Sequence, residues 1–440
     1  MHSDESFFLI RNAKIFRRGQ LTKVNLVVSR RSGRIIRIFK SPLSNRFFVK
    51  RSEGVYDAEG CWALPGVVDM HVHFREPGEV EKEDFKSGSA AAAAGGVTFV
   101  ADMPNNNPPI NSTRRLKEKA KLVENKSFIN YALYLGLPQL PDEISEAYHG
   151  NVKPIGVKVY YYRGREKDLF HSGTLPKDPL YVVHPEDPNF IEEGGYETYK
   201  EFEAARPVRA EVEAIKNLLN MAEKGYRIHF THITSKRSLD LIKQGKREGL
   251  PISADVTPHH LLLDIESVQD HQSIAKCHPP LRREVDRRAL FEGLLTGQID
   301  AIASDHAPHR LEEKHQDFVN APAGIPSVQF MFPLTCSLAR NYRKKRLETI
   351  IKAHTRIPSQ LLGLDGRGWI KTGNFADILL YDPTAKWIIK AENTFSKAKF
   401  SPYNGRVVKG KVISTFVNGR LVFHRGELLT KEGRFFPIEL

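Results

Sequence analysis

Short runs of apolar, β-forming residues occupy both ends of the chain. Runs such as FFLIRNAKIF and GRIIRIF near the amino terminus, and ADILLYD and GKVISTFVNG near the carboxyl terminus, are typical of strands separated by Gly, Asn and Ser turns. Two terminal blocks of strands predict one small composite β-sandwich domain. We expect its two parts to be residues 1–62 and 366–440.

The middle of the chain, residues 63–365, alternates apolar strand-like runs with helical stretches. Runs such as GVTFVADM, IGVKVYYY and RIHFTHI are separated by patterns such as SAAAAAGG and VRAEVEAIKNLLNMAEKG, which end at glycine. Repeated strand–helix units of this kind predict a parallel sheet. Over about 300 residues they favour an α/β fold of the (β/α)8 barrel class.

Composition narrows the class of protein. With 40% hydrophobic and 27% charged residues, the chain has an ordinary globular balance, which excludes wholesale disorder. No run of 18 apolar residues appears, so we expect no membrane-spanning helix. The amino terminus lacks the apolar core of a secretory signal, and three scattered cysteines are too few for a disulfide framework. These features favour a reducing cytoplasm.

The net charge of +14 is concentrated at the two ends of the chain. Residues 1–52 contain 13 Lys/Arg and 2 Asp/Glu, and residues 372–440 contain 11 and 6, so the middle is close to neutral. A basic surface suits nucleic acid, but no zinc knuckle, aromatic ladder or helix-turn-helix pattern accompanies this charge. We therefore expect neither a nucleic-acid partner nor a membrane partner.

Candidate metal ligands recur where strand-like runs end. His71 and His73 are two residues apart, so on a strand both side chains face the same way and can reach one ion. His184 ends LYVVH, His232 ends RIHFTH and Asp305 ends IDAIASD. The carboxyl ends of barrel strands share one face, where active sites lie. The sequence therefore predicts a metal centre at that face.

Lys158 lies inside an apolar strand-like run, where a buried ammonium group is costly. Two interpretations stay open. The lysine can extend its charged end to solvent from the strand end. Alternatively, CO₂ can convert the amine to a carbamate, an anionic ligand able to bridge two metal ions.

Several motifs together resemble the dihydroorotases of the amidohydrolase superfamily. They are HVHFREPG (71–78), KEDF (82–85), DMPN (102–105), VTPHH (256–260), KCHPPLR (276–282) and SDHAPH (304–309), in that family's order. The resemblance implies a (β/α)8 barrel with a composite β-sandwich domain. It also implies two Zn²⁺ ions bridged by hydroxide and by a lysine carbamate. The implied metal ligands are His71, His73, carboxylated Lys158, His184, His232 and Asp305.

The resemblance implies reversible hydrolysis of the cyclic amide of dihydroorotate to N-carbamoyl-aspartate, within de novo pyrimidine synthesis. The bridging hydroxide would attack the ring amide, with Asp305 as general base and then general acid. The implied substrate contacts are Arg75, Asn105, His278, His309, Ala323 and Gly324. Arg75 offers a bidentate fork to the substrate carboxylate, although a barrel-rim salt bridge is an alternative role for it. Asn105, within PNNNPP, suits an Asx turn as well.

Some positions depart from the family pattern and keep other functions open. His278 occupies a position where the family usually has asparagine, which raises a change of preferred substrate. The KCxPP pattern at 276–280 and the SPYxGR pattern at 401–406 lean toward allantoinases. An allantoinase or hydantoinase-type cyclic amidohydrolase is therefore the alternative enzyme. A non-catalytic scaffold relative is the alternative of another class, but here every ligand position is filled.

Three further histidines are predicted to be structural. His229 is three residues from His232 and so lies on the opposite strand face. His259 and His260 follow a strand in TPHH, and the implied metal site is complete without them.

The resemblance also implies a homodimer or higher homo-oligomer and a possible association with aspartate transcarbamoylase.

Overall fold

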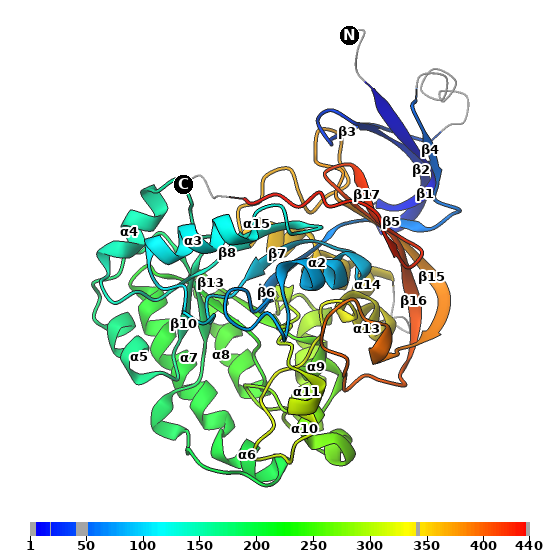
Figure 1. Cartoon of the computed structure of the whole chain (residues 1–440). Coiled ribbons are helices and arrows are strands. Elements are labelled where there is room, and N and C mark those ends of the chain that lie inside the picture. Colours follow the sequence, from blue (N-terminus) through cyan, green and yellow to red (C-terminus); the bar gives the residue numbers. More distant parts are fainter. Residues whose placement is uncertain (1–5, 18, 41–51, 340–343, 437–440) are drawn as a thin grey trace.

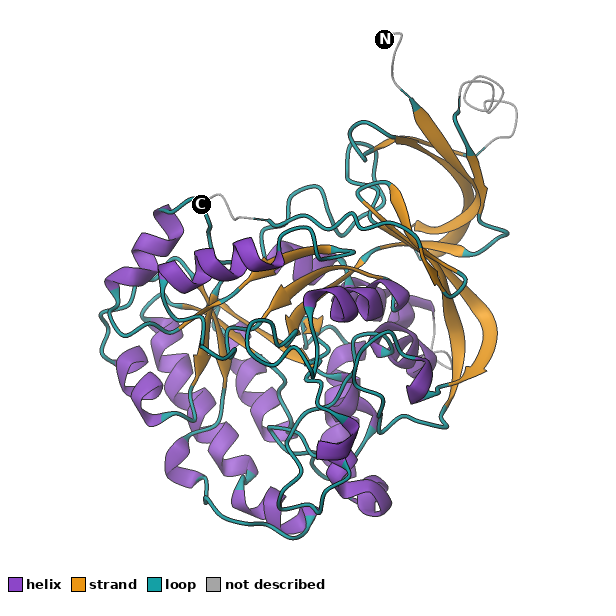
Figure 2. Ribbon diagram, viewed as in Figure 1, coloured by secondary structure: helices purple, strands orange, loops and turns teal. Residues whose placement is uncertain are grey.

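A computed structural model of the chain describes residues 6–17, 19–40, 52–339 and 344–436. It has two parts (Figure 1). A β domain contains strands from both ends of the chain, and a larger barrel is surrounded by helices (Figure 2). The expected fold class, a barrel with a β domain from both termini, is confirmed.

The β domain is one nine-stranded sheet in the order β18-β17-β16-β15-β5-β1-β2-β3, with β4 paired to β1. Its strands are β1 (Phe7–Arg17), β2 (Gln20–Ser29), β3 (Ile35–Phe39), β4 (Val55–Asp57), β5 (Trp62–Pro65), β15 (Ile378–Ile388), β16 (Val407–Val417), β17 (Arg420–His424) and β18 (Glu427–Leu428). The two ends of the chain meet where β5 runs antiparallel to β15. Strand β5 extends this sheet to Pro65, beyond the expected boundary at residue 62.

Residue alternation explains why these segments form a sheet with one apolar face. Along the first half of β16, Val408 and Val412 are buried, whereas Lys409 and Lys411 are exposed. This period of two suits an antiparallel sheet with one covered face. The sheet curls around buried apolar side chains contributed by both termini, which include Ile10, Leu26, Leu380 and Phe416.

The barrel strands are parallel neighbours in two hydrogen-bonded groups, β6-β7-β8 and β9-β10-β11-β12-β13-β14. They are β6 (Val67–Val72), β7 (Val97–Asp102), β8 (Asn130–Leu133), β9 (Leu135–Gly136), β10 (Val157–Tyr160), β11 (Leu180–His184), β12 (Arg227–Phe230), β13 (Ile252–Val256) and β14 (Ala301–Ile302). Because only Tyr134 separates β8 from β9, the two form one interrupted strand and the barrel has eight. A parallel bridge between Val72 and His306 closes it.

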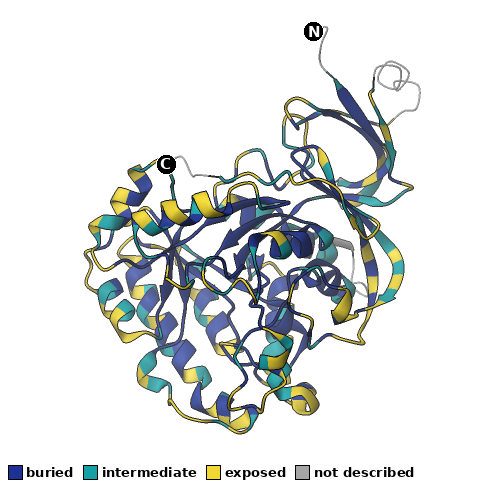
Figure 3. Ribbon diagram, in the orientation of Figure 1, coloured by how far each residue is buried: buried dark blue, intermediate teal, exposed yellow. Residues whose placement is uncertain are grey.

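Helices cover the outside of the barrel, so its strands are buried on both faces (Figure 3). The helices are α2 (Phe85–Ala94), α3 (Thr113–Val123), α4 (Asp142–His149), α5 (Gly164–His171), α6 (Tyr199–Ala205), α7 (Val208–Glu223), α8 (Lys236–Arg247), α9 (Pro258–Leu262), α10 (Gln272–Ala275), α11 (Glu284–Leu295), α12 (Leu311–Lys314), α13 (Met331–Ala339), α14 (Lys344–His354) and α15 (Arg356–Leu361), with 3₁₀ turns at Pro188–Phe190, Glu266–His271 and Ala391–Asn393. The alanine run forms α2, which begins at the capping residue Asp84. Gly88 leaves room there for the Phe74 ring.

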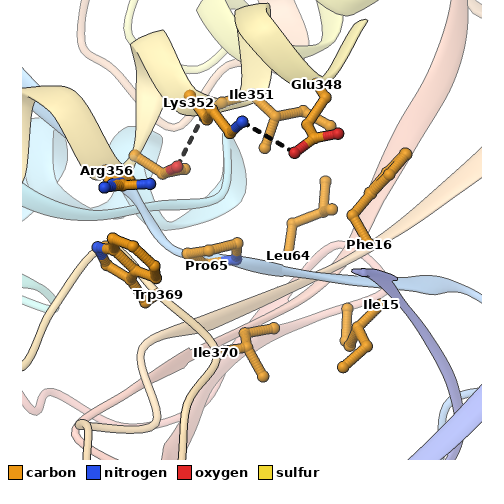
Figure 4. A pocket seen from close by; sticks show the side chains of 13 residues that line it. Ile15, Phe16, Leu64, Pro65, Glu348, Ile351, Lys352, Arg356, Trp369 and Ile370 are labelled. Atoms are coloured by element: carbon orange, nitrogen blue, oxygen red, sulfur yellow. Dashed lines mark hydrogen bonds and ion pairs between the residues drawn. The ribbon is translucent and has the colours of Figure 1, made fainter. Parts of the chain in front are cut away.

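A cavity of about 250 Å³ lies where the β domain meets the barrel (Figure 4). Phe16, Leu64 and Ile370 give it apolar walls, and the Arg356 guanidinium stacks on the Trp369 ring at 3.7 Å. This cavity adjoins the start of β6, whereas the predicted metal ligands follow the ends of the barrel strands, so it is not the predicted site. Among the described residues, no helix combines the length and apolarity needed to cross a membrane.

Candidate metal centre

Three of the predicted ligands meet at the mouth of the barrel. His71 is the next-to-last residue of β6, and His73 is the first residue after that strand. Asp305 lies three residues beyond the end of β14. The Nε2 atoms of His71 and His73 are 3.2 Å apart, and Asp305 Oδ1 lies 3.2 Å and 3.1 Å from them. Two imidazole nitrogens and a carboxylate oxygen therefore face one point, which is an arrangement suited to a divalent ion.

The other predicted ligands surround this group. The ring of His232 lies 5.3 Å from that of His71 and 4.6 Å from that of His184, measured between centroids. Lys158, on β10, is fully buried, and its ammonium nitrogen has no hydrogen-bond partner among the described residues. Burial lowers the pKa of Lys158 to about 8. A buried amine with a lowered pKa has the neutral form that reacts with CO₂ at moderate pH.

Burial and mutual contact shift the pKa values of several groups at the mouth. Burial lowers the pKa values of His71 and His232 well below the usual range. Burial alone would raise the pKa of Asp305, but His71 and His73 outweigh it and hold that pKa well below the usual range. His232 and Asp305 have positive φ angles of 42° and 45°. Such backbone strain in non-glycine residues is frequent at functional sites.

Hydrogen bonds fix which ring nitrogen of His71 and of His73 faces the centre. His71 Nδ1 lies 2.7 Å from Thr231 Oγ1, whose hydroxyl donates to Asp255 at 3.0 Å. His73 Nδ1 lies 2.7 Å from the amide oxygen of Asn105. Both Nδ1 atoms therefore carry the proton, and both Nε2 lone pairs are free to bind metal.

His184 offers the other ring nitrogen, Nδ1, to the centre. His184 Nε2 lies 2.6 Å from a carboxylate oxygen of Glu186, so its Nδ1 lone pair remains for a metal ion. Arg206 holds the same carboxylate through two guanidinium nitrogens. The neighbouring Arg206 and His184 keep the pKa of Glu186 far below its usual range against the effect of burial.

The predicted substrate contacts Arg75 and His309 lie together beside the centre. Arg75 is buried, with a φ angle of 60°, and it donates from Nε to Pro308 O at 3.2 Å. Its guanidinium lies 3.3 Å from His309 Nε2, and within the described part of the chain it forms an ion pair with the Glu79 carboxylate at 3.9 Å. Burial and the charge of Arg75 lower the pKa of His309 to about 2, so the His309 ring is neutral.

Three of the other predicted contacts already have partners within the chain. The carbonyl of Ala323 lies 3.0 Å from His309 Nε2, and the Gly324 N–H donates to Lys276 O at 2.8 Å. The Asn105 oxygen accepts from His73, which leaves its NH₂ group to donate to a ligand.

His278 is set apart from the ligand group. Its exposed ring lies 5.2 Å from that of Phe202 and lines a cavity of about 420 Å³. Tyr162 and Arg206 line the same cavity, and the Tyr162 ring lies 4.8 Å from that of His184. His278 therefore lies on the His184 side of the mouth.

The donor set fits divalent metal ions on one condition. A histidine that binds a metal does so as a neutral imidazole, so the carboxylate of Asp305 would be the single negative charge of the set, and an unmodified Lys158 ammonium would repel a cation placed beside it. A carbamate on Lys158 would remove that repulsion, give the isolated nitrogen a function and add oxygen ligands. The buried, unpartnered nitrogen is thus the observation that fits the implied binuclear centre.

Sequence reasoning did not assign Thr231, Asp255 or Glu186 to this site. A polar residue within an apolar strand run was the available signal for Thr231 and Asp255, and VHPE contained Glu186. His229 is buried between Ser253 and Asp255, at 2.7 Å and 2.9 Å, which is consistent with the structural role expected for it.

Comparisons with known proteins agree on the family. The model of the amidohydrolase family matches residues 62–152 and 191–422. A dihydroorotase from Thermus aquaticus is 37% identical over 84% of this chain and 90% of its own length, and one from Carboxydothermus hydrogenoformans is 33% identical over 92% and 95%. The structure of an L-hydantoinase (dihydropyrimidinase) from Arthrobacter aurescens superimposes with a TM-score of 0.88 at 25% identity, covering 97% of this chain and 99% of that one. The chain therefore belongs to the amidohydrolase family and is a hydrolase acting on cyclic amides.

Proposed function

We propose that this protein is a dihydroorotase, which interconverts dihydroorotate and N-carbamoyl-aspartate in pyrimidine synthesis with two Zn²⁺ ions. The observation that carries the proposal is the buried guanidinium of Arg75 beside the candidate metal centre. Among the described residues, its ion-pair partner is Glu79, at 3.9 Å. A buried arginine needs an anionic or hydrogen-bonding partner. The ring carboxylate of dihydroorotate has the geometry to supply one.

Neighbouring groups extend this anion site. The NH₂ group of Asn105 is left to donate after its oxygen accepts from His73, and the neutral His309 lies next to Arg75. A cyclic amide without a carboxylate would leave the Arg75 guanidinium with only its contacts to Pro308, His309 and, at 3.9 Å, Glu79. A substrate carboxylate adds a charge-assisted partner, so the substrate that carries one is favoured.

Asp305 is the residue best suited to transfer the proton. Its low pKa keeps it ionised at neutral pH, and its Oδ1 atom faces His71 and His73. We assign Asp305 to accept a proton from the water that attacks the ring carbonyl. It would then pass this proton to the amide nitrogen as the C–N bond breaks. When bound between His71, His73, carboxylated Lys158, His184, His232 and Asp305, the metal ions would lower the pKa of water and polarise the carbonyl.

Substitution of Arg75 tests the proposal. We expect Arg75→Met to lower kcat/KM for dihydroorotate by at least about 100-fold, because a charge-assisted bidentate contact is lost. The same variant is expected to change turnover of 5,6-dihydrouracil, which lacks the carboxylate, by less than about threefold. Equal losses on both substrates would assign Arg75 to the structure of the rim instead of to substrate recognition.

A hydantoinase-type activity is the second candidate. It is supported by the cavity of about 420 Å³ beside His184 and by the similarity to the Arthrobacter aurescens L-hydantoinase. That cavity, lined by His278, Tyr162 and Arg206, would accept a substituent on a five-membered ring. This reading leaves the buried charge of Arg75 without a substrate partner, so we rank it second.

A further inference from the structure

A second cluster of metal-binding side chains lies outside the candidate centre. His259 and His260 are adjacent on the short helix α9, and Cys277 lies two residues beyond α10. The three residues are buried, and one ligand atom from each lies within 4.8 Å of the other two. None of the three was assigned to the predicted centre.

His259 lacks the partners that a buried imidazole requires. The side chain is fully buried, and neither Nδ1 nor Nε2 has a hydrogen-bond partner among the described residues. A neutral imidazole carries one N–H and one lone pair. A buried polar atom without a partner destabilises the folded state. An ion or a water molecule would remove part of this cost.

His260 and Cys277 direct their polar atoms toward the same backbone group. His260 Nε2 lies 3.2 Å from the carbonyl oxygen of Pro279, and the Cys277 thiol donates to that oxygen at 3.4 Å. His260 Nδ1 is held by the Thr257 hydroxyl at 2.8 Å, which leaves Nε2 as its available ligand atom. When a metal ion binds, the Cys277 thiol would release its proton to solvent, and the His260 proton would move from Nε2 to Nδ1, where the Thr257 hydroxyl oxygen can accept it. The ion would then bind two atoms, Nε2 and Sγ, that already converge.

The chemistry of the donors selects the ion. Burial raises the pKa of Cys277 to about 12, so the thiol becomes a thiolate only when a cation binds it. One thiolate and two imidazoles suit Zn²⁺ and related ions. Bond lengths of about 2.0–2.3 Å would draw the three ligand atoms closer together by about an ångström.

We propose that His259, His260 and Cys277 form a separate metal site that binds Zn²⁺ or a similar thiophilic divalent ion. The ion would connect α9 to the segment that carries Lys276 and His278. It would thereby fix the position of His278 at the cavity of about 420 Å³. This proposal rests on the three side chains alone and does not depend on which cyclic amide the enzyme hydrolyses.

Cobalt substitution of the full chain tests the site. The predicted ligands of the main centre contain no sulfur, so a near-ultraviolet charge-transfer band from thiolate to Co²⁺ would report only on a cysteine site. We expect this band in the wild type and in Cys336→Ser, a matched change of another buried thiol. We expect it to disappear in Cys277→Ser and to weaken at least about fivefold in His259→Gln, with one zinc ion fewer per chain in the zinc-loaded variants.

Absence of the band in the cobalt-loaded wild type would overturn the proposal, as would its survival in Cys277→Ser. An unchanged band and zinc content in His259→Gln would also overturn it and would assign water as the partner of His259. If Cys277→Ser does not fold, the comparison of the wild type with His259→Gln decides the question.

Discussion

Glu186 is expected to tune the metal centre without touching the metal. It is fully buried and accepts a hydrogen bond from His184 at 2.6 Å, while Arg206 holds the same carboxylate. Glu186→Gln keeps the side-chain volume but removes the charge that both neighbours face. Loss of a partner of this kind lowers metal affinity or activity by about 10- to 100-fold. In kcat/KM this range equals about 1.4–2.7 kcal/mol of transition-state stabilisation.

The assay pairs zinc affinity, measured by competition with a chelator, with kcat/KM for dihydroorotate. Glu203→Gln is the matched control, because within the described part of the chain the Glu203 carboxylate forms its ion pair with Arg282, at 2.9 Å, and not with a predicted ligand. The control is expected to stay within about threefold of the wild type. If Glu186→Gln keeps wild-type zinc affinity and turnover, the carboxylate does not hold His184 for the metal, and the reasoning is refuted.

Three further outcomes follow from the structure. Lys158→Ala is expected to lose activity by at least about 1,000-fold and to regain part of it in millimolar acetate or propionate, which supply the missing anionic ligand; no recovery would count against the carbamate. At Gly324, with φ of 154°, an added Cβ would lie 2.5 Å from Ala307 O, so Gly324→Ala should lower kcat/KM at least about tenfold, whereas Gly373→Ala, which meets nothing within 4 Å, should not; equal kinetics would contradict this. Burial raises the pKa of Glu211 from 4.5 to about 7, so the folded state binds more protons than the unfolded state between these values. The free energy of unfolding should therefore fall as pH rises through that window, and less steeply in Glu211→Gln, as urea unfolding at pH 5 and pH 8 would show; identical slopes would exclude the effect.

The positions of the candidate ligands at the ends of the barrel strands were predictable, because the local periodicity of the sequence determines where a strand ends and which way its side chains face. His71 and His73 share a strand face by the period of two, and the parallel barrel brings His184, His232 and Asp305 to the same mouth. The β domain was likewise predictable from strand-forming runs at both ends. The pairing of β5 with β15 was not, since it joins segments more than 300 residues apart whose register depends on the folded barrel between them.

The partners of the histidines could not be predicted in the same way. Thr231 and Asp255 meet because β12 and β13 pair in register, and Asn105 turns its oxygen to His73 only in the folded loop. The unpartnered nitrogens of His259 were also invisible in the sequence, where the TPHH motif indicated a structural role. These contacts depend on side-chain geometry, which a single sequence does not encode locally.

The comparison of substrates on one zinc-loaded preparation tests the central claim most directly. The measurement is kcat/KM for dihydroorotate, hydantoin and allantoin at neutral pH, with Asp305→Ala as the inactive reference. The account predicts that dihydroorotate is hydrolysed at least about 100-fold more efficiently than either of the others, and that Asp305→Ala loses this activity. A preference for hydantoin or allantoin, or near-normal turnover in Asp305→Ala, would contradict it.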